Sequence, residues 1–255
     1  MQKSLVKSKI NNLNKPEIKQ AWYSTYGDNY EEGLRFLLKS IDSNSFISEN
    51  LLEDIKNKKP IQYILGEWDF YTGTYKISPA VLIPRPETEV LVDYIKNNIA
   101  DIKSILDLGT GSGCIAIELA KIFKDAHVLG VDISTKALEI AHKNNWQSNY
   151  KVKFMESNWF ESVKNKFDLI VANPPYVPEK KGGFVSYSKI GFVEEKHKAL
   201  FKLCNNMKCK WVLSNSNTET VREALKKFNI EEIDARRAIN STNPAAKTKE
   251  VIVYN

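Results

Sequence analysis

The sequence has no apolar run long enough to cross a membrane. A membrane-spanning helix needs about eighteen or more consecutive apolar residues, and polar or charged residues interrupt every apolar run of this 255-residue chain. The opening segment, residues 1–7, also lacks the apolar core of a signal peptide. We therefore expect a cytoplasmic protein that makes no use of a membrane.

Cysteine and histidine are scarce, with three residues of each. Cys114, Cys204 and Cys209 are an odd number without the spacing of metal ligands, so we expect reduced thiols, as is usual in the cytosol. The histidines are dispersed, and none lies near a carboxylate or a cysteine at metal-ligand spacing. The sequence therefore predicts no metal site.

The net charge is +6. A positive balance indicates an anionic partner such as nucleic acid or a ribosome-associated factor. Lysines scattered over a surface can equally serve only to solvate it. The charge alone leaves both interpretations open.

Three regions are expected along the chain. Residues 1–59 are predicted to form a small helical domain, because Leu34, Leu37, Leu38 and Ile41 recur at helical spacing. Residues 60–84, rich in aromatic and β-branched side chains around two glycines, predict a β-hairpin linker.

Residues 85–255 are predicted to form an α/β domain with a doubly wound, Rossmann-like sheet, because strand and helix patterns alternate to the end. A helix is expected over residues 88–99, after the break at Pro84-Arg85-Pro86. The last strands are expected at residues 211–214 and 251–254.

The most informative segment is Asn173-Pro174-Pro175-Tyr176, which follows the apolar run 167–172. The run predicts a buried strand that the prolines end, at the edge where open α/β sheets bind ligands. There the Asn173 oxygen and a proline carbonyl can accept both hydrogens of a planar NH2 group, while the Tyr176 ring lies against its plane. This sequence is typical of methyltransferases that act on glutamine amides, adenine N6 or guanine N2.

A glycine loop lies upstream. The strand-like residues 104–108 lead into Asp107-x-Gly109-x-Gly111-x-Gly113, and a helical pattern follows. Glycines permit tight turns and let the backbone approach a ligand. The loop resembles the S-adenosylmethionine version more than the dinucleotide fingerprint. Asp132 ends the next strand, where it can accept hydrogen bonds from both ribose hydroxyls.

Residues 60–178 resemble the PrmC (HemK) family in three further segments: 60–66, 68–73 and 82–89, the last reading Leu-Ile-Pro-Arg-Pro-Glu-Thr-Glu. The resemblance implies S-adenosyl-L-methionine as cofactor and, as substrate, N5 of the glutamine in the Gly-Gly-Gln loop of a peptide chain release factor. It also implies that residues 1–59 bind that protein partner.

The same resemblance assigns the site residues. Catalysis falls to Asn173, Pro174 and Tyr176. The cofactor is bound by Asp107, Gly109, Gly111, Gly113, Asp132, Asn158 and Trp159, although the family usually has Asp at position 158. The substrate is bound by Arg85, Glu87, Asn173, Pro174, Pro175 and Tyr176, and Phe184 and Tyr187, which lie beyond the resembling stretch, could pack over the glutamine side chain.

After Tyr176 the chain instead resembles the C-terminal part of Dam-type DNA adenine N6-methyltransferases, in segments 184–188, 213–218 and 236–241. DNA adenine is therefore the alternative substrate, with Phe184 and Tyr187 as walls for a flipped base. Only about sixty residues separate Gly113 from Asn173, which leaves no room for the DNA-reading insertion of Dam-type enzymes. A third hypothesis is a hybrid that keeps the fold as a binding module only.

Overall fold

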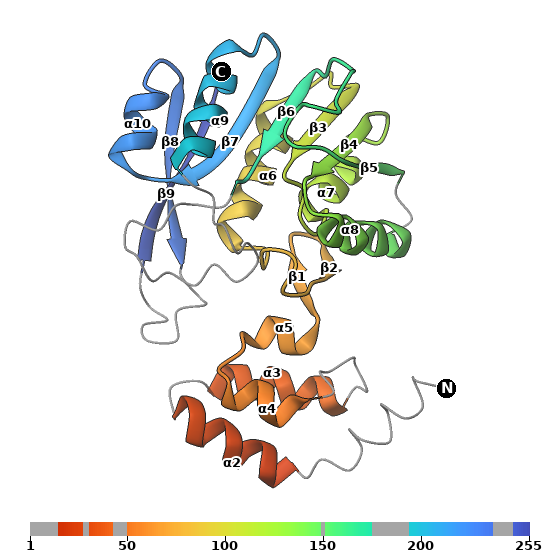
Figure 1. The fold of residues 1–255 in the computed structure, drawn as a ribbon, viewed down its shortest axis with the longest axis vertical. Coiled ribbons are helices and arrows are strands. Elements are labelled where there is room, and N and C mark those ends of the chain that lie inside the picture. The colour runs from red at the N-terminus through yellow and green to blue at the C-terminus, as the bar shows by residue number, and fades with distance from the viewer. Residues whose placement is uncertain (1–14, 28–30, 43–49, 149–150, 175–193, 237–246) are drawn as a thin grey trace. The chain divides into compact units, whose positions relative to one another are not determined.

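The computed structural model describes residues 15–27, 31–42, 50–148, 151–174, 194–236 and 247–255 (Figure 1). The chain divides into two compact units between Trp68 and Asp69. Among the described residues, no helix combines the length and the apolar character that a membrane span requires.

The first unit contains the helices α2 (Lys15–Tyr26), α3 (Glu31–Asp42), α4 (Leu51–Lys56) and α5 (Ile61–Leu65). The expected helix around Leu34 and Leu37 is confirmed as α3, and both side chains are buried. They pack with Ile18 and Trp22 of α2 and Leu51 of α4. The helical spacing of these residues thus builds a small apolar core.

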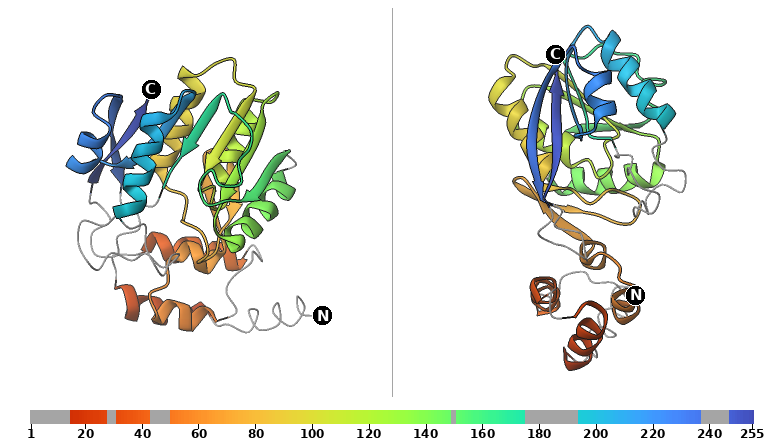
Figure 2. Two further views of the ribbon diagram at one scale, coloured as in Figure 1. Left: turned by 45° about the horizontal axis from the view of Figure 1, so that its top comes forward. Right: turned by 90° about the vertical axis from the view of Figure 1, so that its left-hand side faces the viewer.

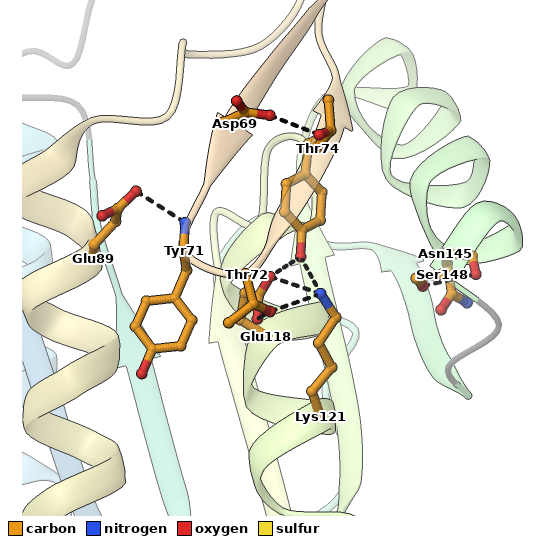
Figure 3. Close-up of polar contacts among 10 residues, drawn as sticks. Asp69, Tyr71, Thr72, Thr74, Glu89, Glu118, Lys121, Asn145 and Ser148 are labelled. Carbon is orange, nitrogen blue, oxygen red and sulfur yellow. Dashed lines mark hydrogen bonds and ion pairs between the residues drawn. The ribbon is translucent and has the colours of Figure 1, made fainter.

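A β-hairpin follows, with strands β1 (Glu67–Phe70) and β2 (Gly73–Lys76), so the boundary between the units falls within β1. A buried carboxylate fastens the hairpin to helix α7 (Cys114–Ile122). Glu118 accepts hydrogen bonds from Tyr75 Oη (2.5 Å) and Thr72 Oγ1 (2.7 Å), and Lys121 Nζ lies 2.8 Å away (Figure 3). The paired positive charge makes a fully buried carboxylate tolerable here.

The second unit is built on a seven-stranded sheet in the order β5-β4-β3-β6-β7-β9-β8. The first five strands in this order are parallel, whereas β9 is antiparallel to both of its neighbours. The strands are β3 (Ser104–Leu108), β4 (His127–Asp132), β5 (Val152–Glu156), β6 (Leu169–Ala172), β7 (Lys210–Ser216), β8 (Asn229–Arg236) and β9 (Lys247–Tyr254).

Helices cover both faces of this sheet (Figure 2). On one face lie α6 (Pro86–Asn98), α7 and α8 (Thr135–Ser148), and on the other α9 (Glu194–Asn206) and α10 (Glu219–Ala224). Each face has its own apolar core, which explains why the central strands are apolar throughout. The expectation of a doubly wound, Rossmann-like α/β sheet is confirmed.

The individual elements agree closely with the sequence predictions. The helix expected from residue 88 begins at Pro86, because proline at the first helical position already has the required φ and has no N–H to leave unbonded. The strands expected at 211–214 and 251–254 lie within β7 and β9. Strand β8 had not been predicted.

Candidate functional site

The carboxyl ends of the parallel strands meet at one edge of the sheet. Leu108, the last residue of β3, pairs with Val131 of β4 on one side and with Ala172 of β6 on the other. The residues that follow these strands are therefore neighbours: the glycine loop, Asp132 and Asn173. At this edge open α/β sheets bind their ligands.

The glycine loop is held by backbone hydrogen bonds. The amides of Gly109 and Thr110 both donate to the carbonyl of Val131, at 2.8 and 2.9 Å, and the amide of Gly113 donates to the carbonyl of Thr110 at 2.8 Å. Gly109, Gly111 and Gly113 all have positive φ, of 71°, 56° and 78°. Residues with a Cβ rarely adopt this conformation, so the loop requires glycine at these positions.

The glycines differ in what surrounds them. A Cβ at Gly113 would lie 2.8 Å from Phe154 and 3.1 Å from Ala141, so this glycine is needed for packing. A Cβ at Gly109 would meet nothing within 4 Å, and one at Gly111 only the carbonyl of Gly109 at 3.9 Å. The loop is thus tightly packed where α7 begins and open along Gly109 and Gly111, where a ligand can approach the backbone.

Asp107 lies buried beneath this loop. The Thr110 hydroxyl donates to its Oδ2 at 2.6 Å, whereas Oδ1 is buried with no hydrogen-bond partner among the described residues. Burial raises the pKa of Asp107 to about 7; the Thr110 hydrogen bond and the backbone amide of Ala116 lower it, and the nearby Asp132 raises it. A buried, half-satisfied carboxyl group is suited to a ligand that brings a positive charge or a donor.

Asp132 is fixed by two backbone amides. Gly111 N donates to Oδ2 and Ser134 N to Oδ1, each at 2.9 Å. Burial raises its pKa, and the two amide hydrogen bonds oppose that rise. Each carboxylate oxygen has the capacity to accept more than one hydrogen bond, so Asp132 can still accept hydrogen bonds from the hydroxyls of a ligand. The next residue, Ile133, is 60% exposed and presents an apolar surface beside the carboxylate; the sequence prediction had missed it.

The other two residues assigned to the cofactor, Asn158 and Trp159, follow β5 at the same edge. Asn158 Nδ2 donates to Glu161 Oε1 at 2.7 Å, and Trp159 has a φ of 53°. The buried Ser157 hydroxyl donates to the Trp159 carbonyl at 2.8 Å and stabilises this turn. The amide of Ser157 donates to the carbonyl of Asp132, so this turn lies next to the end of β4.

Asn173 follows β6 directly, as predicted, and its side chain is held at both ends. Its Nδ2 donates to Thr88 Oγ1 of α6 at 3.0 Å, and its Oδ1 accepts from Ser214 Oγ of β7 at 2.7 Å. Thr88 and Ser214 are buried, whereas Asn173 is half-buried. Pro174 is buried beside it. Neither hydroxyl had been identified from the sequence.

The residues assigned to the substrate are only partly described. Arg85 precedes α6, and its Nη1 lies 3.7 Å from the buried Glu250 Oε1; its carbonyl accepts from the amide of Thr88. Glu87 is buried, with 4% of its surface exposed. Pro175, Tyr176, Phe184 and Tyr187 lie outside the described residues.

A further buried amide ties the glycine loop to the hairpin. Asn144 of α8 donates to the carbonyls of Ser112 (2.8 Å) and Lys76 (3.0 Å) and accepts from the amide of Lys76 (2.7 Å). It is 3% exposed, so water cannot replace these bonds. No local sequence signal marks it, because its partners lie 32 and 68 residues away.

The fold and part of the sequence are similar to those of known methyltransferases. Residues 86–202 match the Methyltransferase small domain. A solved tRNA (uracil-54, C5)-methyltransferase of Pyrococcus abyssi, in complex with S-adenosyl-L-homocysteine, superposes with a TM-score of 0.51. It is 21% identical and the superposition covers 74% of this chain and 42% of that chain, so the likeness concerns the fold alone. The fold is the Rossmann-like fold of S-adenosylmethionine-dependent methyltransferases.

The sequence is also similar to release factor glutamine methyltransferases. That of Flavobacterium psychrophilum is 44% identical over 160 residues, which make up 60% of this chain and 55% of the relative. That of Streptococcus pneumoniae is 41% identical over 154 residues, 60% of this chain and 54% of the relative. The chain spans about half the length of the curated relatives it matches.

Proposed function

We propose that this protein transfers a methyl group from S-adenosyl-L-methionine to N5 of the glutamine in the Gly-Gly-Gln loop of a peptide chain release factor. The observation that carries the proposal is the Asn173 amide, held by two hydroxyl groups at the end of β6 and beside the strand that leads into the glycine loop. The names of the relatives in Flavobacterium and Streptococcus support the choice of substrate.

The edge of the sheet has the features that the cofactor needs. The open backbone at Gly109 and Gly111 would receive it, Asp132 would accept from its ribose hydroxyls, and Ile133 would lie against its adenine. The buried Asp107 carries an oxygen without a partner among the described residues, which suits the positive charge of the cofactor. Asn158 and Trp159 would complete the adenine side. When bound, the cofactor supplies a methyl group on a positively charged sulfur.

Asn173 and Pro174 would act on the nitrogen that receives the methyl group. The Asn173 oxygen and the Pro174 carbonyl accept the two hydrogens of the planar NH2 group, which aims its lone pair along the line of attack. Amide oxygens are too weakly basic to take a proton from this nitrogen, so both groups position it. The S–CH3 bond would break as the N–CH3 bond forms, S-adenosyl-L-homocysteine would leave, and the proton lost by the nitrogen would pass to water. Tyr176 would stack on the plane of the amide.

Residues around α6 would receive the protein substrate. Arg85 and Glu87 flank the start of this helix, and Thr88, one residue further on, bonds Asn173. Pro175, Phe184 and Tyr187 would line the side chain of the glutamine, and the helices of residues 1–59 would bind the rest of the release factor. The assignments of Arg85, Glu87 and Pro175 follow from the resemblance of residues 60–178 to the PrmC family, whereas Phe184 and Tyr187 lie in the segment that resembles Dam-type enzymes and could equally pack over a glutamine side chain.

The substrate is tested by incubating the protein with methyl-labelled S-adenosylmethionine and either a release factor or adenine-containing duplex DNA. We expect label in the release factor, and none when its loop glutamine is changed to alanine. Label in DNA alone, with binding that weakens as salt rises, would instead support an adenine N6-methyltransferase. Label in neither would leave only the binding-module hypothesis.

The cofactor is tested separately by calorimetry. S-adenosylmethionine should bind the wild type and bind Asp132→Ala at least ~10-fold more weakly, because a hydrogen-bonded carboxylate contributes about 1.5–3 kcal/mol. Gly109→Asp should also weaken binding, since it places a side chain in the open space of the loop. Equal affinity in all three proteins would mean that the cofactor does not bind at this edge.

A further inference from the structure

Asn173 is gripped by two residues from distant parts of the chain. Thr88 lies 85 residues before it, in the first turn of α6, and Ser214 lies 41 residues after it, in β7. β7 pairs directly with β6, with Ala172 opposite Leu213, so Asn173 and Ser214 both lie one residue beyond that pair. The strand register itself thus brings the Ser214 hydroxyl to the Asn173 amide.

The two hydroxyl groups bond opposite ends of one planar group. Thr88 Oγ1 bonds the nitrogen end at 3.0 Å and Ser214 Oγ bonds the oxygen end at 2.7 Å. A planar group held at both ends cannot rotate about its last side-chain bond without breaking a hydrogen bond. Thr88 and Ser214 are 3% and 1% exposed, so water cannot replace either hydroxyl.

We infer that Ser214 and Thr88 are positioning residues, which fix the plane of the Asn173 amide and thereby the direction in which its oxygen accepts a substrate hydrogen. The inference rests on the proposed function for its kinetic consequence. An amide oxygen has two lone pairs, and the Ser214 bond uses one of them. Losing the grip lets the amide rotate away from the geometry that methyl transfer needs, so it slows transfer without weakening cofactor binding.

These two hydrogen bonds also connect the C-terminal part of the chain to the candidate site. Thr88 belongs to the segment that resembles the PrmC family, and Ser214 to the segment 213–218 that resembles Dam-type enzymes. Both segments supply one hydroxyl to the same amide. Through Ser214, the C-terminal part of the chain therefore contributes one positioning hydroxyl to the site.

Single-turnover methyl transfer to the release factor tests the kinetic role. Ser214→Ala and Thr88→Val should each slow transfer roughly 10-fold, as expected for one buried hydrogen bond, with unchanged affinity for cofactor and substrate. Ser214→Thr and Thr88→Ser keep the hydroxyl and should recover most of the rate. Ser216→Ala is the matched control, because Ser216 lies two residues along β7 and its hydroxyl donates to Asn215 Oδ1, at 3.4 Å. Its rate should equal that of the wild type.

A double variant separates positioning from general damage. Since Ser214 acts through Asn173, Asn173→Ala with Ser214→Ala should be no slower than Asn173→Ala alone. The inference would be overturned if the rate loss of the double variant were the product of the two single losses, or if Ser214→Ala transferred methyl at the wild-type rate.

The grip can also be measured when no methyl is transferred, which separates its failure from that of the proposed function. The side-chain NH2 resonances of Asn173 are identified by their loss in Asn173→Ala. They should shift in Ser214→Ala and in Thr88→Val and stay in place in Ser216→Ala. Unmoved resonances in both hydroxyl variants would overturn the grip, whatever the enzyme proves to methylate.

Discussion

The two halves of the candidate site are stabilised in different ways. The glycine loop after β3 is held mainly by its own backbone and by the next strand, through the amides of Gly109, Thr110 and Gly113. The Asn173 amide after β6 is held by side chains 85 residues before it and 41 residues after it. One half is thus specified by a short stretch of sequence, and the other by the way the sheet and α6 come together.

This difference teaches how a substitution acts at each half. In the glycine loop, backbone conformation and packing dominate, so changes there should appear in stability and in cofactor binding. At Asn173, we propose that the side-chain amide acts on the substrate, and two hydroxyls support it, so changes there should appear in the rate of methyl transfer. The predictions below use this separation, from the largest expected effect to the smallest.

The largest effect is expected at the packed end of the glycine loop. Gly113→Ala should lower the free energy of unfolding by about 4 kcal/mol, from a positive φ and from overpacking against Phe154 and Ala141. Gly109→Ala is the matched control, with a similar φ but no atom within 4 Å of its Cβ, and should lower it by only about 1 kcal/mol. Urea unfolding measures both. Equal losses would mean that packing does not distinguish the two glycines.

Asn144 tests whether the loop also depends on a distant support. Asn144→Asp removes the amide hydrogens that bond the carbonyls of Ser112 and Lys76, and should lower the free energy of unfolding by about 3 kcal/mol. Cofactor affinity should fall with it. Asn145→Asp, at the next residue, removes the amide hydrogen that bonds the carbonyl of Val152 and should leave cofactor affinity unchanged in calorimetry. Unaltered affinity in Asn144→Asp would contradict the link to the loop.

Asp107 gives the loop a pH dependence. Burial raises its pKa to about 7, whereas an unfolded aspartate has a pKa of about 3.9. Between these values the folded protein holds a proton that the unfolded chain has released, so this group makes the protein less stable as pH rises from about 4 to about 7. When the pH is raised from 5 to 7.5, the free energy of unfolding of Asp107→Asn should therefore rise by about 2 kcal/mol relative to that of the wild type.

Urea unfolding of wild type and Asp107→Asn at both pH values measures this gain. Parallel pH dependences in the two proteins would show that Asp107 is ionised in the folded state throughout the range. Cofactor affinity gives a second readout, since a positive ligand should bind the wild type more tightly as Asp107 loses its proton.

The smallest effect is expected at the start of α10, which follows β7. Thr218 caps α10, where its hydroxyl accepts from the amide of Val221. Thr218→Ala should lower the free energy of unfolding by about 1 kcal/mol, the usual contribution of such a cap. Cofactor affinity and transfer rate should not change, and a slower transfer would mean that α10 contributes to the site.

Features formed by residues close together in the sequence could be predicted, whereas contacts between residues far apart in the sequence could not. The glycine loop, Asp132 and the position of Asn173 could be predicted, because a strand followed by a turn is visible within a few residues. Strand β8 could not, because its centre, Glu231-Glu232, is charged and exposed as an edge strand permits. Thr88, Asn144 and Ser214 could not either, because their partners are brought to them only by the folded sheet and helices.

The most direct test of the division between the two halves is single-turnover methyl transfer by Asn173→Ala at saturating S-adenosylmethionine, with cofactor affinity measured on the same protein. We expect cofactor affinity equal to that of the wild type and transfer at least ~30-fold slower, corresponding to about 2 kcal/mol for one preorganised polar contact. Transfer at the wild-type rate, or loss of cofactor binding in this variant, would contradict the assignment of Asn173 to the transfer step.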